Sequence, residues 1–148
     1  MPSTFLTDCD SEVAQRFRGL HDAFVSAYPG WTMPVVCTYR SPDEQFALYQ
    51  HGRMQGADEK WFVTDSAQVL TDLDGIHLRS FHNDKPARAV DVEIHSPDGR
   101  KCWNYEDAVL ADGMANPWFW YRDNAPRFGL LCGGSWKTLH DWPHVQLA

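Results

Sequence analysis

The sequence contains no long apolar run, no cluster of basic residues and no closely spaced pair of cysteines. No apolar stretch approaches the roughly 20 residues that a transmembrane helix requires, so we expect no membrane insertion. The formal net charge is -7 and the 13 basic residues form no run, which excludes nucleic acid as an expected partner, because phosphate binding requires clustered lysine and arginine. The four cysteines are scattered without C-x-x-C spacing, which favours reduced thiols over a disulfide framework.

The first residues also lack the basic and then apolar pattern of a secretion signal. We therefore expect the protein to stay in the cytoplasm of the cell that produces it. Its 148 residues, of which 43% are hydrophobic, suffice for one domain with a core of its own. Residues 1–148 are accordingly expected to form a single domain, which acts as a monomer.

Apolar spacing and capping residues predict the helices. Apolar side chains recur at steps of three and four over residues 11–28, which is the spacing of a helix with one buried face. Ser41-Pro42-Asp43-Glu44 combines an N-cap serine, a proline at the first helical position and a capping-box glutamate, and predicts a helix to about His51. Two shorter helices are expected over residues 105–110 and 118–122.

Alternating and β-branched segments predict short strands. Residues 33–39 include the β-branched residues Val35, Val36 and Thr38, and residues 88–94 alternate Val, Val and Ile with Ala, Asp and Glu. The turn Ser96-Pro97-Asp98-Gly99 predicts a hairpin between the strand before it and a strand after it. The remaining expected elements are strands at 128–131 and 144–147, and a long loop over 52–75 that holds a short helix or strand.

Two imidazoles and two carboxylates stand in two short motifs far apart in the chain. His82 and Asp91 belong to the first motif, and Asp141 and His144 belong to the second. Hydrolytic zinc sites use this type of ligand set, in which three protein groups hold the metal and a fourth position is left to water. The pattern therefore predicts a site like that of a zinc peptidase.

Several motifs follow one another in the order typical of a known peptidase family. They are Tyr39-Arg40-Ser41-Pro42 with Gln45, Leu48-Tyr49 and Gly52-Arg53; Ser80 with His82; Ala87-Arg88-Ala89-Val90-Asp91; and Phe128-Gly129-Leu130, Gly133-Gly134, Trp136 and Asp141-Trp142-Pro143-His144. Together they resemble the zinc D-alanyl-D-alanine carboxypeptidase and L-alanyl-D-glutamate endopeptidase family, which includes compact phage endolysins and the vancomycin-resistance D,D-peptidases. The resemblance covers most of the chain and implies an α+β fold of the Hedgehog and D,D-peptidase type, with a small antiparallel sheet flanked by helices.

The resemblance also implies a role for each matching residue. His82, Asp91 and His144 are implied to bind Zn²⁺, and Asp141 is implied to act as the general base for the attacking water. Arg40 matches the arginine that polarises the scissile carbonyl or grips a substrate carboxylate. From the residues alone, Arg40 could equally be an ordinary salt-bridge partner of an acidic residue.

Three further residues are expected to contact the substrate. By the resemblance, Ser80 and Gln45 match positions that hydrogen-bond the peptide near the cut. Trp142 stands between the base and the last ligand in the sequence, so we expect it to line the cleft. An alternative for Asp141 also stays open, since its carboxylate could cap a helix or orient His140 instead of acting as a base.

The link between His82 and Asp91 departs from the family pattern Ser-x-His-x-x-Gly-x-Ala-x-Asp. It is two residues longer, and Ala87 stands where the family has glycine. We expect residues 83–86 to bulge outward as a loop before the strand, so that the ligand geometry is kept. The missing glycine would matter if position 87 required a positive φ, because alanine disfavours that conformation.

The resemblance favours a zinc-dependent peptidoglycan endopeptidase that hydrolyses the L-alanyl-D-glutamate bond of bacterial stem peptides. We expect a phage endolysin, which accumulates in the cytoplasm of the infected bacterium and reaches the wall after the membrane is breached. The same core would suit a D-alanyl-D-alanine carboxypeptidase or dipeptidase. An alternative of another class is a non-catalytic, zinc-stabilised protein that binds the cell wall.

Overall fold

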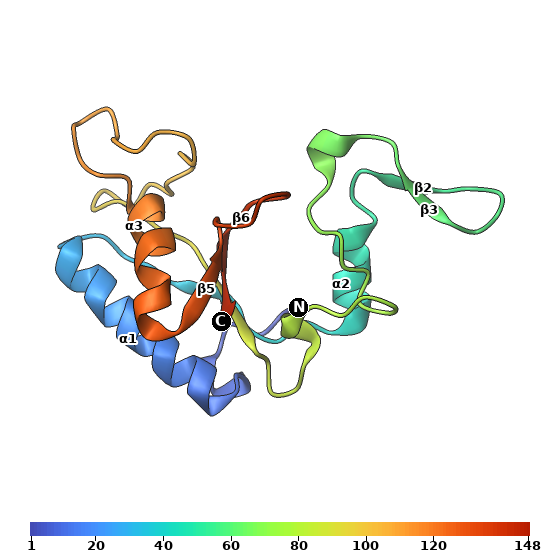
Figure 1. The fold of residues 1–148 in the computed structure, drawn as a ribbon, viewed down its shortest axis with the longest axis horizontal. Helices are drawn as coiled ribbons and strands as arrows, with labels where there is room; N and C mark the ends of the chain where they lie inside the picture. The colour runs from blue at the N-terminus through green and yellow to red at the C-terminus, as the bar shows by residue number, and fades with distance from the viewer.

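A computed structural model describes all 148 residues and shows a small antiparallel sheet with two of the three α-helices beside it and the third set apart (Figure 1). The α-helices are α1 (Ser11–Ala27), α2 (Pro42–Tyr49) and α3 (Pro117–Asn124), and the 3-10 helices are η1 (Leu6–Asp8), η2 (Ser66–Gln68), η3 (Phe81–Asn83) and η4 (Ala125–Phe128). The strands are β1 (Val35–Cys37), β2 (Arg53–Gln55), β3 (Trp61–Val63), β4 (Ala89–Val92), β5 (Leu130–Gly133) and β6 (Asp141–Leu147). None of the helices is both long and apolar enough to cross a bilayer.

The main sheet determines which side chains face the core and which face away from it. Its strand order is β1-β4-β6-β5, and each neighbouring pair is antiparallel. In the register of β4 and β6, Val90 lies opposite Val145, and Asp91 lies opposite His144. Because opposed residues share a face of a sheet, Val90 and Val145 point together into the core. Asp91 and His144 therefore share the other face.

The hydrophobic core lies between this sheet and helices α1 and α3. The predicted apolar face of α1 is buried, and Phe17, Leu20 and Phe24 are each at most 1% exposed. Trp118 and Tyr121 of α3 are fully buried in the same cluster. The core covers one face of the sheet, and the opposite face can therefore carry polar side chains.

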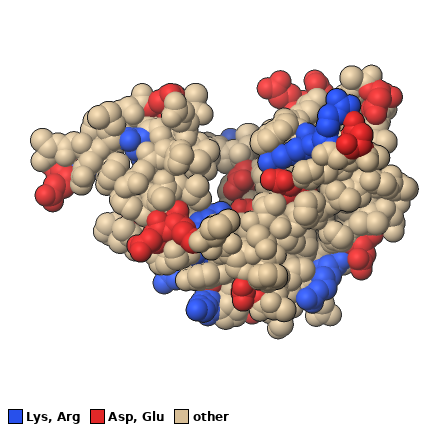
Figure 2. Space-filling model, turned by 180° about the vertical axis from the view of Figure 1, so that it is seen from behind, with Lys and Arg blue, Asp and Glu red and all other residues tan.

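A second lobe, formed by residues 42–78 and called the α2 lobe below, begins at α2. The predicted capping box is confirmed, because the Ser41 hydroxyl accepts a hydrogen bond from the Glu44 amide and the Glu44 carboxylate accepts one from the Ser41 amide. The segment expected to be a loop contains a two-stranded hairpin of β2 and β3, so it has more regular structure than predicted. Figure 2 shows the surface hollowed between the α2 lobe and the rest of the molecule.

One expected element is absent and another is reduced. The helix predicted over residues 105–110 does not form, although the Asn104 side chain accepts hydrogen bonds from the amides of Glu106 and Asp107 as a helix cap would. The segment instead ends in an antiparallel bridge between Val109 and Ala115. The Asn116 side-chain amide then donates to the carbonyls of Asn104 and Asp107, so the side chains supply the partners that a helix would supply. The turn at residues 96–99 reverses the chain as predicted, and the segments on its two sides pair through an antiparallel bridge between His95 and Lys101. The pairing extends no further, so the second arm of the expected hairpin is not a strand.

The other predicted elements are present. The strand at residues 88–94 is confirmed as β4, and the helix at residues 118–122 lies inside α3. The strand expected over 33–39 is shorter, since β1 has three residues and pairs only with β4. The two terminal strands are confirmed as β5 and β6, which pair on either side of the Gly133-Gly134 turn.

Candidate metal centre and active site

Three donor atoms from three separate elements meet at one point. His82 lies on η3, while Asp91 and His144 are the opposed pair of β4 and β6. Asp91 Oδ1 lies 3.0 Å from His82 Nε2 and 3.0 Å from His144 Nδ1, and the two ring nitrogens are 3.1 Å apart. The structure thus brings together the three predicted ligands.

The outer contacts of the two imidazoles decide which nitrogen faces this point. His82 Nδ1 lies 2.6 Å from the carbonyl oxygen of Thr38, which can only accept, so Nδ1 carries the proton. His144 Nε2 lies 2.8 Å from Gln146 Oε1 and donates to it in the same way. When a ring is neutral, which is the form that binds a metal, the nitrogen that faces Asp91 offers a lone pair, and the outer hydrogen bond fixes the orientation of the ring. When the ring is protonated, the same nitrogen donates to Asp91 instead.

Three electron-pair donors this close together repel one another unless a proton or a metal ion lies between them. Around a tetrahedral zinc ion with bonds of about 2.0–2.1 Å, neighbouring ligand atoms lie roughly 3.3 Å apart, slightly more than the separations seen here. Two imidazole nitrogens and one carboxylate oxygen also match the ligand chemistry of Zn²⁺. The residues present therefore fit a zinc ion, and binding of zinc by His82, Asp91 and His144 stays a prediction.

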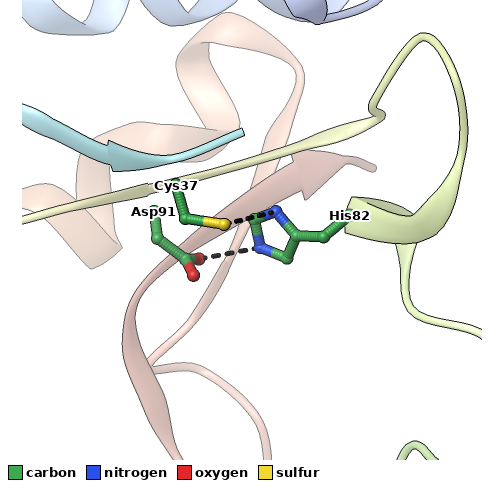
Figure 3. A group of neighbouring side chains, drawn as sticks. All are labelled: Cys37, His82 and Asp91. Atoms are coloured by element: carbon green, nitrogen blue, oxygen red, sulfur yellow. Dashed lines mark hydrogen bonds and ion pairs between the residues drawn. The ribbon is translucent and has the colours of Figure 1, made fainter. Parts of the chain in front are cut away.

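Cys37 is close to two of these residues but lies on the wrong side of the His82 ring to join them. Its sulfur is 3.7 Å from His82 Nδ1, the nitrogen that donates to Thr38, whereas Asp91 lies beside Nε2 (Figure 3). Burial raises the pKa of the Cys37 thiol to about 12, so the thiolate that metals prefer is disfavoured. Cys37 packs behind the site as a neutral thiol.

The two histidines keep Asp91 ionised, and Arg40 contacts its second oxygen. Burial by itself would raise the pKa of Asp91, but the charges and hydrogen bonds of His82 and His144 outweigh it and hold that pKa well below its usual range. Arg40 Nη2 lies 3.4 Å from Asp91 Oδ2, on the oxygen that does not face the histidines. Arg40 therefore occupies one oxygen of the carboxylate and leaves the other free to act as a ligand.

Asp141 lies beside this centre without a hydrogen bond from any protein group. Its carboxylate is within 4.8 Å of the ligand atoms of Asp91 and His144. Burial and the negative charge of Asp91 raise the pKa of Asp141 to about 6 in the metal-free protein. A helix cap is ruled out, because Asp141 begins strand β6, and His140 Nδ1 contacts the Gly134 carbonyl instead of Asp141.

The centre opens into a cleft of about 440 Å³ between the sheet and the α2 lobe. Asp91, Asp141 and His144 form one wall, and Leu48 and Leu70 belong to the α2 lobe on the opposite side. Residues from both lobes therefore surround any molecule that reaches the three ligand atoms. The cleft is wide enough for a peptide segment and is not a closed cavity.

Gln45 and Ser80 lie in the cleft wall, where both are engaged in hydrogen bonds within the protein. Gln45 is 1% exposed, accepts from Arg40 Nη1 through its Oε1, and donates through Nε2 to Thr71 Oγ1 and the Leu73 carbonyl. Ser80 caps η3, since its hydroxyl accepts from the His82 amide. Both residues position the site, and their contacts with a substrate stay predictions.

Trp142 and Trp136 occupy different places from those that the sequence suggests. The Trp142 ring stacks on Phe119, with 5.2 Å between ring centroids, and also packs on Tyr105, on the side away from the cleft. Trp142 is not among the residues that line the cleft, whereas Trp136 is. The Trp136 ring lies 5.3 Å from the ring of His144, so Trp136 is the aromatic wall of the metal centre.

Asn83 is a buried part of the site that the sequence analysis placed in an outward loop. It is 2% exposed; its Oδ1 accepts from the Ser80 amide and its Nδ2 donates to the Arg40 carbonyl. In the sequence, Asn83 stands three residues after Ser80, which is the spacing of a capping box and could have predicted this position. Ala87 is fully buried and has a negative φ, so the missing glycine causes no strain there.

Zinc affinity is expected to fall as the pH is lowered. Burial alone would lower the pKa of His144, but its hydrogen bond and charge interaction with Asp91 raise that pKa overall. Since a ligand histidine must lose its proton to bind zinc, the fall should begin above pH 6.5, the usual pKa of histidine. Competition with a chromogenic chelator between pH 5.5 and 8 measures this, and an affinity that stays constant across this range would contradict it.

Replacing Asp141 with asparagine is expected to stabilise the metal-free protein at neutral pH. The pKa of Asp141 in the folded protein, about 6, lies above its value in the unfolded protein. The folded protein therefore loses stability as the pH rises through 6 and the buried carboxyl ionises. The gain from Asp141→Asn should reach at most about 3 kcal/mol at pH 7.5 and vanish near pH 4. Urea unfolding of chelated protein at both pH values tests this. The exposed Asp123→Asn variant is the control, and an equal effect of Asp141→Asn at both pH values would refute the prediction.

The chain is similar to known proteins in sequence and in fold. The chain is 29% identical over 128 residues to the peptidoglycan L-alanyl-D-glutamate endopeptidase CwlK of Bacillus subtilis, a match that covers 85% of this chain and 68% of CwlK. Its fold is similar to that of the L-Ala D-Glu endopeptidase ChiX of Serratia marcescens, with a TM-score of 0.58, 20% identity, and coverage of 100% of this chain and 90% of ChiX. No model of a known protein family matches the sequence.

Two further solved structures share the fold. The LD-carboxypeptidase LdcB gives a TM-score of 0.56 at 19% identity, over 94% of this chain and 58% of LdcB. The vancomycin-resistance D,D-pentapeptidase VanY, solved in complex with Zn(II), gives a TM-score of 0.50 at 17% identity, over 94% of this chain and 72% of VanY. The shared fold, the match to CwlK and the order of the motifs support the predicted resemblance of this chain to the zinc D-alanyl-D-alanine carboxypeptidases and L-alanyl-D-glutamate endopeptidases.

Proposed function

We propose that the protein is a zinc-dependent peptidoglycan peptidase that hydrolyses the L-alanyl-D-glutamate bond of stem peptides. The observation that carries this proposal is the convergence of His82, Asp91 and His144, with Asp141 free beside them, at the wall of an open cleft. The similarity to CwlK and ChiX, both named for cleavage of this bond, supports the choice of substrate.

The three ligands would leave one coordination position of a zinc ion open. His82, Asp91 and His144 would hold zinc through three atoms, which is the number that catalytic zinc sites use. Zinc, when bound, supplies a Lewis acid that polarises a carbonyl and acidifies water. Thr38 and Gln146 keep the two imidazoles in the required tautomers, because each accepts the outer ring proton.

Asp141 is the residue that moves protons in this proposal. No protein group donates a hydrogen bond to its carboxylate, so both oxygens can accept a proton from the attacking water. Asp141 then passes that proton to the nitrogen of the leaving D-glutamyl residue. A carboxylate within 4.8 Å of the ligand atoms of Asp91 and His144 is close enough to take a proton from water at this centre.

Arg40 supplies a fixed positive charge to the floor of the cleft. Its guanidinium is held by Gln45 Oε1 at 2.9 Å and by Asp91 Oδ2 at 3.4 Å, and its side chain is 13% exposed. A preorganised charge in a partly dry site stabilises the negative charge that develops on the scissile carbonyl oxygen. Arg40 therefore holds Asp91 in position and favours the transition state.

Digestion of purified peptidoglycan by zinc-loaded protein tests the proposal. Mass spectrometry should find new amino-terminal D-glutamate, and chelated protein should produce none. Release of D-alanine instead would make the protein a carboxypeptidase. An absence of any zinc-dependent product from several wall chemotypes would overturn the peptidase proposal and favour a zinc-stabilised wall-binding protein.

We further propose that this activity serves as a phage endolysin, made in the cytoplasm of an infected bacterium. The support is the family resemblance, because the family includes compact phage endolysins. Expression inside a bacterial host should then leave the cells intact until the membrane is permeabilised, after which turbidity should fall within minutes. Unchanged turbidity after permeabilisation would reject the lytic role while leaving the peptidase activity to the digestion experiment.

A further inference from the structure

We propose that Arg79 recognises a free carboxylate on the leaving side of the cut bond, and makes the site selective for stem peptides whose D-glutamate is not amidated. This inference rests on the proposed function, since it names the group that distinguishes one stem peptide from another. It concerns a residue outside the matched family motifs, because Arg79 precedes Ser80 and none of the recognised motifs includes it.

Arg79 lies in the wall of the cleft that holds the metal centre, and some of its hydrogen-bond donors are unpaired. It lines the same cleft as His82, Asp91 and Asp141, and its side chain is 57% exposed. One donor, Nη2, bonds to the Asn83 carbonyl at 2.7 Å, which orients the guanidinium. Its Nε and Nη1 have no partner in the protein.

The nearest acidic group holds Arg79 only weakly. Asp84 Oδ1 lies 4.0 Å from Arg79 Nη2, beyond hydrogen-bond distance, and Asp84 also faces Arg88 at 3.8 Å. An exposed ion pair at this distance contributes little, so an incoming carboxylate can compete for the free donors. The position of Arg79 is nevertheless fixed, because the next residue, Ser80, caps η3.

No other cation of the cleft is free for this task. Arg40 is the second basic residue in the cleft wall, and both its terminal nitrogens are engaged, Nη1 by Gln45 and Nη2 by Asp91. Its Nε is buried and cannot reach a ligand in the cleft. No lysine lines the cleft. Arg79 is thus the basic residue of the cleft wall that has donors free to form hydrogen bonds with a substrate carboxylate.

The chemistry of the proposed substrate supplies such a group. A glutamate whose amine forms the bond to be cut has two carboxyl groups, and the chain can continue through only one of them. The other carboxyl is free and ionised at neutral pH unless the cell amidates it. A protein of net charge -7, with Asp91 and Asp141 in its cleft, would repel this anion without a local cation. The planar fork of an arginine fits a carboxylate with two parallel hydrogen bonds.

A pair of synthetic stem peptides tests the inference, one with D-glutamate and the other with the α-amide D-isoglutamine. The zinc-loaded protein should cleave the acid with a kcat/KM roughly tenfold higher than the amide, since a hydrogen bond to a charged group is worth about one order of magnitude. Arg79→Gln should lower kcat/KM for the acid by about the same factor and leave the amide nearly unchanged. Arg79→Lys, which keeps the charge and loses the fork, should retain part of the preference.

Arg88→Gln is the matched control, because Arg88 faces the same Asp84 from outside the cleft and should keep the full preference. Zinc content and the unfolding midpoint of each variant show whether the neighbouring site is intact. Calorimetry with the two product peptides, which begin with D-glutamate or D-isoglutamine, measures the same preference as a ratio of Kd values without turnover.

Equal cleavage of the two peptides by the unaltered protein, or a full preference in Arg79→Gln, would overturn the role of Arg79. A lack of cleavage of both peptides would instead count against the proposed function, and the product-binding ratio would still decide about Arg79. A peptide that ends in D-alanyl-D-alanine separates the two possible carboxylates. If Arg79→Gln impairs release of its last residue and leaves the D-glutamyl preference intact, Arg79 reads a terminal carboxylate and the inference is wrong.

Discussion

Replacing Asp141 with asparagine is expected to reduce the rate of stem-peptide hydrolysis by roughly 100- to 10,000-fold while zinc stays bound. A positioned general base contributes about this factor, and an amide cannot take a proton from water. Because Asp141 lies beside the three ligand atoms and is not one of them, zinc content should stay near one ion per chain. Steady-state kinetics with a stem peptide and metal analysis of the same sample measure the two quantities.

Asp123→Asn provides the control for this experiment, since Asp123 is an exposed carboxylate paired with Arg122 at the surface. It should keep full activity. If Asp141→Asn retains more than about a tenth of the activity, another group takes the proton, and the role assigned to Asp141 is wrong. If the variant loses its zinc together with its activity, Asp141 acts as a ligand rather than as a base.

Replacing His144 with alanine is expected to remove both zinc and activity, with a fall in rate of roughly 1,000-fold or more. Loss of one of three ligands leaves an incomplete site, and Lewis-acid stabilisation of several kcal/mol corresponds to about three powers of ten in rate. His144 is 4% exposed, and the alanine also removes the partner of Gln146. Zinc titration and kinetics at saturating zinc are the measurements.

His77→Ala is the matched control for His144→Ala. His77 pairs with Asp74 in the same way that His144 pairs with Asp91, but its side chain is 85% exposed and lies outside the cleft wall. It should keep zinc and activity. Full zinc occupancy of His144→Ala at micromolar zinc would contradict the ligand assignment, and circular dichroism of the zinc-free proteins shows whether the fold survives each change.

Local signals in the sequence were sufficient for the elements that carry most of the site. The capping box at Ser41 and Glu44 depends on residues three apart, and it predicted α2 correctly. The alternation around Asp91 predicted a strand that is apolar on one face, which is how β4 is buried. Such patterns succeed because neighbours in the chain determine both the hydrogen bonds and the buried face.

The misplaced parts depend on contacts between distant residues. The region of residues 105–110 has apolar spacing for a helix, but the Asn116 amide bonds to carbonyls nine and twelve residues away and holds the segment open. Trp142 does not line the cleft as expected, because its ring stacks on Phe119 and packs against the core, and Trp136 lines the cleft instead. A local sequence pattern does not predict which of two nearby tryptophans will pack against a helix that is distant in the chain.

The opposed pair of Asp91 and His144 also affects how the protein folds. These residues are 53 positions apart in the chain, and His82 and His144 are separated by 62. Contacts between residues so distant form late, after the entropy of closing a long loop has been lost, so the three ligands meet only when β4 and β6 are already paired. Zinc should therefore slow unfolding of the finished sheet and leave the folding rate nearly unchanged, because the metal binds after the transition state for folding.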